Sequence, residues 1–179
     1  MSKFRPILSI EPHPSRRETG IMFYQWTESM SVGVPLIDND HKALIHLINR
    51  LHESVSAGDT YDVLDELMSR LVDYIDIHFV REERVMEACA YPETPGHKRE
   101  HGEFVAYIRG LRERFSAETA ADLAGDLASY LKDWLNHHIL IQDMAYRPYA
   151  EGNGPAAKAA EAFGPGLFDK MRTSSAESR

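Results

Sequence analysis

Hydrophobic residues recur at alternating steps of three and four through the middle of the chain. This spacing places them along one side of an α-helix, and the alternation typical of strands is scarce there. Residues that favour helix ends divide the region into four helical segments. We expect helices from Asp38, a favourable N-cap, to Gly58; from Asp59 or Thr60 to just before Tyr91-Pro92; from Thr94 to about Phe115; and from Thr119 to just before Pro148.

The predicted fold class is all-α. Because the connections are short, consecutive helices should pack antiparallel, as an up-down-up-down four-helix bundle over residues 21–150. Residues 1–20 contain three prolines and little periodicity, which predicts an irregular N-terminal arm. Glycine, proline, alanine and serine dominate residues 151–179, which predicts a C-terminal tail with room for one docked turn around Leu167, Phe168 and Met171.

Histidine is unusually frequent, with nine residues in 179. The helical period places five of them and one glutamate within the apolar stripes: His41, His78, Glu82, His97, His101 and His138. His46, His52 and His137 fall beside the stripes, and His13 lies in the arm. The stripe of the fourth helix runs Leu123, Leu127, Leu131, Trp134, His138 and Ile141. Arg81, Glu83, Arg84 and Glu87 are expected on a solvated face.

The predicted topology gathers the six polar stripe residues at one end of the bundle. The start of the first helix, the end of the second, the start of the third and the end of the fourth all meet there, within a slab of roughly 10–15 Å. A single histidine on an apolar face is most often a hydrogen-bonded core residue. Imidazoles and a carboxylate that converge from four helices are costly to bury unless a metal satisfies them. The whole constellation therefore predicts a metal site.

Five imidazoles and a carboxylate are too many ligands for one ion with an open position, and they suit two ions bridged by carboxylates. The chain lacks the His-Glu-x-x-His motif of zinc proteases and the Glu-x-x-His motif of ferritin-like di-iron proteins. Its single cysteine excludes an internal disulfide and cysteine-based zinc or iron–sulfur sites.

Charge and hydropathy narrow the possible partners. The formal net charge of −8 makes nucleic acid a poor partner. No run of residues approaches the roughly 18 apolar residues that span a membrane, and the first twenty residues lack the apolar core of a secretory signal. We therefore expect a cytoplasmic protein with no membrane partner.

Four stretches of sequence around these histidines carry further characteristic residues. They are Val32-Gly33-Val34 through Asp38-Asn39-Asp40-His41-Lys42; His78-Phe79-Val80-Arg81-Glu82-Glu83 with Met86; Tyr91-Pro92 leading into His97-Lys98-Arg99-Glu100-His101; and Trp134-Leu135-Asn136-His137-His138-Ile139 followed by Asp143. Over about residues 22–149 the chain resembles the hemerythrin family, in particular the single-domain bacterial hemerythrins.

The resemblance implies two iron ions, Fe2+ or Fe3+, joined by an oxo or hydroxo bridge. It implies that His97, His101 and His138 hold one iron, that His41 and His78 hold the other and leave it one open position, and that Glu82 and Asp143 bridge the pair. Asp143 lies five residues after His138, about 140° around a regular helix. A π-bulge or an unwound helix end is therefore required between them.

The resemblance further implies reversible O2 binding, for storage, delivery or sensing. No extra acid, base or nucleophile converges on the stripes, which favours an oxygen-binding protein over an enzyme. The first alternative is a di-iron oxidase, peroxidase or nitric-oxide reductase on the same scaffold. The second is a sensor in which oxygen moves the N-terminal arm or the C-terminal tail onto a protein partner.

Overall fold

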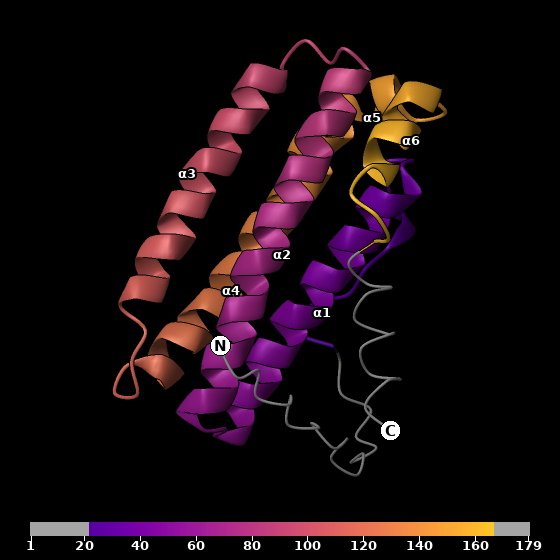
Figure 1. Ribbon diagram of the computed structural model, residues 1–179. Helices are drawn as coiled ribbons and strands as arrows, with labels where there is room; N and C mark the ends of the chain where they lie inside the picture. The colour runs from indigo at the N-terminus through magenta and orange to yellow at the C-terminus, as the bar shows by residue number, and fades with distance from the viewer. Residues whose placement is uncertain (1–21, 167–179) are drawn as a thin grey trace, which may run out of the picture.

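The computed structural model describes residues 22–166, and four long helices form a bundle within them (Figure 1). The helices are α1 (Pro35–Ala57), α2 (Tyr61–Ala88), α3 (Thr94–Glu113) and α4 (Ala120–His137), preceded by the 3-10 turn η1 (Glu28–Met30) and followed by the π-helix η2 (His138–Asp143), α5 (Met144–Ala150) and α6 (Gly154–Glu161). The predicted all-α antiparallel bundle is confirmed. The predicted arm and the cluster around Phe168 lie outside the described residues. Within residues 22–166, no helix is both long and apolar enough to cross a bilayer.

The first helix begins three residues earlier than predicted. Its first residue is Pro35, which suits a first-turn position because proline has no N–H to leave unpaired. Asp38 is therefore not the N-cap. It lies in the first turn, where its carboxylate accepts hydrogen bonds from Ser31 Oγ at 2.6 Å and from the backbone N–H of Val32 at 2.9 Å. Asp38, which was predicted to cap the helix, instead fixes the loop that precedes α1.

The fourth helix does not end before Pro148. It continues through η2 into α5, which contains Pro148. The wider π-turns rotate the chain beyond His138 relative to a regular helix. As a result Ile141, predicted to face the core, is 56% exposed, and Asp143 is fully buried. The prediction for Ile141 was wrong because the period of 3.6 residues does not hold across η2.

Apolar side chains form two buried clusters. The larger one runs along the bundle between α1, α2, α3 and α4. The smaller one lies at the end where α2 finishes and includes Val34 and Ile37 at the start of α1, Val85 and Met86 from α2, and Tyr146 from α5. Figure 1 shows the ends of these helices together at the top of the molecule.

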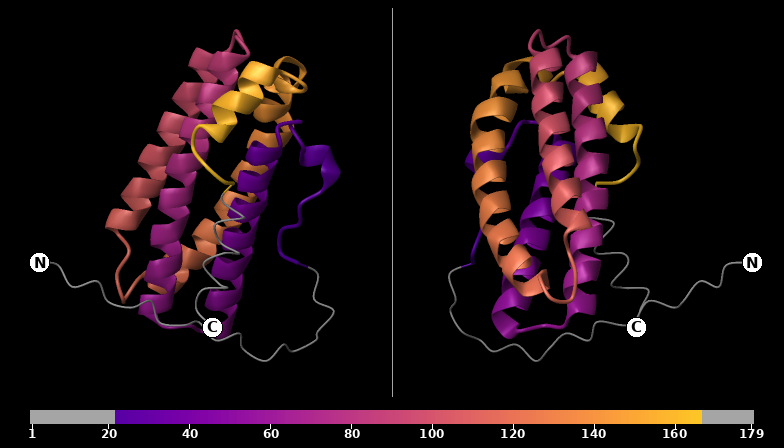
Figure 2. Two further views of the ribbon diagram at one scale, coloured as in Figure 1. Left: turned by 45° about the vertical axis from the view of Figure 1, so that its right-hand side comes forward. Right: turned by 90° about the vertical axis from the view of Figure 1, so that its left-hand side faces the viewer.

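Helix α6 completes the smaller cluster, in a region predicted as a tail. It lies against α2, as both views in Figure 2 show, and it also contacts α1. Ala156 and Ala160 are buried in the cluster, and their small side chains permit the close approach. The side chain of Asn153 caps the helix by accepting a hydrogen bond from the backbone N–H of Ala156 at 3.0 Å.

We predict that alanine is tolerated less well at Gly33 than at Gly58. Both glycines have positive φ, 76° and 71°, so alanine at either costs about 1–2 kcal/mol. A Cβ at Gly33 would also lie 2.8 Å from Cγ of Glu151, whereas nothing lies within 4 Å at Gly58. Urea unfolding should show the larger loss of unfolding free energy for Gly33→Ala. Equal losses for the two variants would contradict this packing of the entry loop against Glu151, just after α5.

Candidate metal centre

The structure brings all seven predicted site residues together at one end of the bundle. They come from α1 (His41), the last turns of α2 (His78, Glu82), the first turns of α3 (His97, His101) and η2 (His138, Asp143). Each is at most 4% exposed. Because only an antiparallel arrangement brings these helix ends together, the topology itself creates the site.

Potential ligand atoms form two groups that share one carboxylate. In the first, one atom each from Glu82, His97, His101 and His138 lie within 4.8 Å of one another. In the second, atoms of His41, His78 and Glu82 do the same. Two adjacent cation positions bridged by Glu82 would account for both groups. The first group offers three imidazoles and the second offers two.

Asp143 faces both groups because of the π-helix. Its Oδ2 lies 3.3 Å from Nε2 of His41, and its Oδ1 lies 3.2 Å from Nε2 of His138 and 3.4 Å from Nε2 of His97. The sequence required either a π-turn or an unwound helix end between His138 and Asp143, and the chain forms the π-turn. This places a second carboxylate between the two groups of imidazoles.

Many polar atoms of this cluster lack a hydrogen-bond partner among the described residues. They are both ring nitrogens of His41 and of His78, Oε2 of Glu82 and both carboxylate oxygens of Asp143. Some lie close to one another, but their orientations do not suit hydrogen bonds. Buried polar atoms are rarely left unpaired, since each costs roughly 1–3 kcal/mol. The imidazole and carboxylate donors fit a pair of cations, which would satisfy these atoms.

Electrostatics in the cluster also favour a cation. Burial raises the pKa of Glu82, but the charge of His78 and the imidazoles that face it outweigh burial and hold that pKa well below its usual value. Burial lowers the pKa of His97, but the carboxylates of Asp143 and Glu82 outweigh burial and raise that pKa to about 10. Without metal, the cluster therefore holds ionised carboxylates beside a protonated imidazole. A cation can take the place of such protons.

Aromatic rings enclose the cluster on the side of the bundle core. Phe79 stacks on the ring of His101 at 3.7 Å, and Trp134 stacks on His138 at 4.4 Å. Phe79 and Trp134 also line a small cavity surrounded by aliphatic and aromatic side chains, including Leu44. The imidazoles thus have fixed orientations and an apolar surrounding.

The sequence pattern missed Tyr146. This residue is fully buried on α5, and its hydroxyl donates a hydrogen bond of 2.8 Å to Oε1 of Glu82. Burial and the nearby charge of Glu82 raise the pKa of Tyr146 well above its usual value, so the hydroxyl keeps its proton. Tyr146 follows Asp143 by three residues. Once Asp143 is placed in the core, this helical spacing predicts that Tyr146 faces the core as well.

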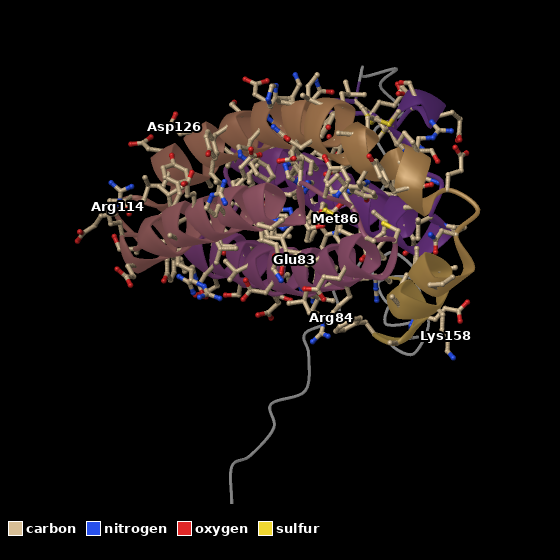
Figure 3. All side chains as sticks on the ribbon, turned by 90° about the horizontal axis from the view of Figure 1, so that it is seen from above. Glu83, Arg84, Met86, Arg114, Asp126 and Lys158 are labelled. Carbon is tan, nitrogen blue, oxygen red and sulfur yellow. The ribbon has the colours of Figure 1, made fainter. Side chains whose placement is uncertain are left out.

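Arg81 does not lie on a solvated face. It is fully buried, and its Nη1 donates a hydrogen bond to Oδ2 of buried Asp40. Glu83 is only partly exposed, and its Oε1 lies 3.2 Å from Nδ1 of His101. Arg84 is exposed as predicted and projects outward in Figure 3, whereas Met86 lies inside the bundle. Two of the charges predicted to face solvent therefore belong to the surroundings of the cluster.

The remaining described histidines lie away from the cluster. His46 and His137 are exposed on α1 and α4. His52 is partly buried and stacks on Phe23, with ring centroids 3.9 Å apart. His13 lies outside the described residues.

Comparison with known proteins gives one consistent family. Residues 32–150 match the hemerythrin HHE cation binding domain. The bacteriohemerythrin of Pseudomonas aeruginosa is 34% identical over 121 residues, which cover 68% of this chain and 77% of that protein. The bacteriohemerythrin of Methylococcus capsulatus is 31% identical over 124 residues, which cover 69% and 93%.

Solved structures agree with the sequence comparison. A crystal structure of wild-type hemerythrin superposes with a TM-score of 0.66 at 28% identity, covering 72% of this chain and 98% of that one. Helix α6 lies beyond the residues that match the domain. The domain match, the similar bundle and the buried histidine–carboxylate cluster lead to the same conclusion, that this chain belongs to the hemerythrin family.

Proposed function

We propose that this chain binds O2 reversibly at a centre of two iron ions. The proposed ligands are His97, His101 and His138 for one iron, His41 and His78 for the other, and Glu82 and Asp143 as bridges. The observation that carries the proposal is the pair of overlapping ligand groups that share Glu82. Because the second group has one imidazole fewer, an iron held there would keep a position at which a diatomic molecule can bind.

Iron, when bound, supplies electrons that O2 can accept and return. Imidazole and carboxylate ligands suit several transition metals, so the donor set alone does not select one. Membership of the hemerythrin family supports iron. The two bridging carboxylates support a pair of ions over a single ion, because each carboxylate faces both imidazole groups.

The chain's own residues orient the ligands and keep water away. The hydrogen bond from Tyr146 fixes one oxygen of Glu82 and leaves Oε2 directed into the cluster. Phe79 and Trp134 fix the rings of His101 and His138 by stacking. The apolar cavity beside these rings suits apolar O2 better than it suits water or a charged reductant.

The same surroundings support an oxygen-binding protein over an oxidase or a nitric-oxide reductase. Tyr146 keeps its proton and is bonded to Glu82, so it is a poor acid or base at neutral pH. Cys89 is buried, and burial raises the pKa of its thiol, which disfavours a nucleophilic role. Whether bound O2 is stored, delivered or sensed depends on partners outside this site.

Anaerobic loading with ferrous iron tests the proposal directly. The loaded protein should take up O2 in proportion to its paired irons and develop a new visible absorption band. Degassing should remove the band, because the apolar surroundings allow O2 to leave unchanged. Immediate irreversible oxidation with release of hydrogen peroxide would favour the oxidase alternative. Absence of iron from the purified and the reconstituted protein would reject the proposal.

We predict that His101→Ala prevents binding of two irons per chain, whereas His137→Ala and His46→Ala do not. His101 lies within the ligand group of three imidazoles, while His137 and His46 are exposed. Iron analysis after anaerobic loading measures the difference, and the two exposed histidines provide matched controls. Full iron content in His101→Ala, or loss of iron in His137→Ala, would show that the assignment is wrong.

Metal loading should release protons. Because the pKa of His97 in the metal-free cluster is about 10, this imidazole carries a proton at neutral pH and must lose it to become a ligand. Glu82 and Asp143 have lowered pKa values and are already ionised. Anaerobic titration calorimetry with ferrous iron in two buffers of different ionisation enthalpy should therefore give about one proton or more per chain. Iron affinity should rise with pH between 6 and 8, and proton-free binding would contradict the prediction.

A further inference from the structure

A segment beyond the matched domain contacts a buried arginine of the bundle. Nη2 of Arg81 lies 3.4 Å from the carbonyl oxygens of Phe163 and Gly164 and 3.2 Å from that of Pro165. The matched domain ends at residue 150. The chain that follows α6 therefore supplies hydrogen-bond acceptors to a guanidinium in the middle of the domain.

The other side of the same guanidinium leads to the metal cluster. Nη1 of Arg81 donates to Oδ2 of Asp40, and both side chains are fully buried. The same Oδ2 lies 3.8 Å from Nδ1 of His78, while Nε2 of His78 lies 3.9 Å from Oε2 of Glu82. Asp40 therefore lies beside Nδ1, the outer ring nitrogen of His78, whereas Nε2, the inner nitrogen, faces the cluster.

Local structure fits the segment to this position. Gly164 has φ of 78°, which turns the chain so that consecutive carbonyls face Arg81. A Cβ at Gly166 would lie 2.1 Å from Oδ1 of Asn39, so the segment packs directly on α1 beside Asp40. Burying a guanidinium is costly unless its donors are satisfied. The three carbonyls and the carboxylate together provide acceptors for Nη1 and Nη2.

We propose that residues 151–166 act as a clamp on the metal centre, in which the carbonyls of residues 163–165 hold Arg81, Arg81 holds Asp40, and Asp40 is placed to accept the Nδ1–H of His78 once Nε2 binds metal. Arg81 and Asp40 are positioning residues in this proposal. A carboxylate at the outer nitrogen fixes the orientation of a ligand imidazole and raises its basicity. His78 is one of the two imidazoles of the iron proposed to bind O2. The clamp therefore rests on the proposed function. It sets the orientation and basicity of one imidazole ligand of that iron from outside the matched domain.

Three variants of the full chain test the clamp. Arg81→Met removes the guanidinium donors and keeps much of the side-chain length. Gly164→Ala strains the turn that presents the carbonyls, without touching Arg81 or a ligand. Gly58→Ala is the matched control, because its φ of 71° is similar, both glycines have open space around them, and it lies at the other end of α1.

Two measurements test separate contacts of the clamp, one between Arg81 and the segment after α6 and one between Asp40 and His78. Hydrogen exchange of the metal-free chain reports whether Arg81 holds residues 157–166. Proton NMR of the anaerobic ferrous protein reports on the last link, because exchangeable imidazole N–H lines shifted by the irons should include one from His78. A loss of general stability would not move one such line selectively.

In Arg81→Met, exchange across residues 157–166 should be faster by about tenfold or more, since the hydrogen bonds that the charged guanidinium donates to the segment are lost. Arg81→Met and Gly164→Ala should move the same single N–H line, and Gly58→Ala should change neither measurement. Unchanged exchange in Arg81→Met, or unmoved lines in Gly164→Ala, would overturn the clamp. A wild-type chain that binds no iron would overturn the proposed function, and the exchange measurement would still decide whether Arg81 holds the segment.

Discussion

Burial of five imidazoles and two carboxylates at one end of an apolar bundle is the constraint on which the rest of the structure depends. Seven ring and carboxylate atoms there lack hydrogen-bond partners among the described residues, although all lie in the interior. Such a cluster is costly unless cations satisfy it. The antiparallel topology, the rings of Phe79 and Trp134 stacked on two of the imidazoles, and the hydrogen bond from Tyr146 to Glu82 hold the cluster in place.

The π-helix allows His138 and Asp143, five residues apart, to face the same side of the chain. A regular helix would direct His138 and Asp143 about 140° apart. The π-turns bring both inward and expose Ile141 instead. The same rotation brings Tyr146 to Glu82. One local departure from the helical period therefore brings the Asp143 carboxylate into the cluster and supplies the hydrogen bond that orients the Glu82 carboxylate.

The sequence predicted the residues that obey the helical period and failed for those that depend on distant contacts. His41, His78, His97, His101 and His138 follow the stripes, so their grouping could be predicted from period and topology. Asp143 came from family resemblance, because its position requires a π-turn. Arg81 lies one residue before Glu82 and has the local pattern of a surface residue. Its burial depends on carbonyls at residues 163–165, more than eighty positions later, and no local pattern encodes such a contact.

We propose that this cluster holds two irons in unequal ligand sets, three imidazoles for one and two for the other. Mössbauer spectroscopy of the anaerobic ferrous protein tests it most directly, because each ligand set has its own quadrupole splitting. Two ferrous environments in equal amounts are expected, of which only the one with the open position changes when a small ligand such as azide is added. A single ferrous environment, with one iron per chain, would contradict it.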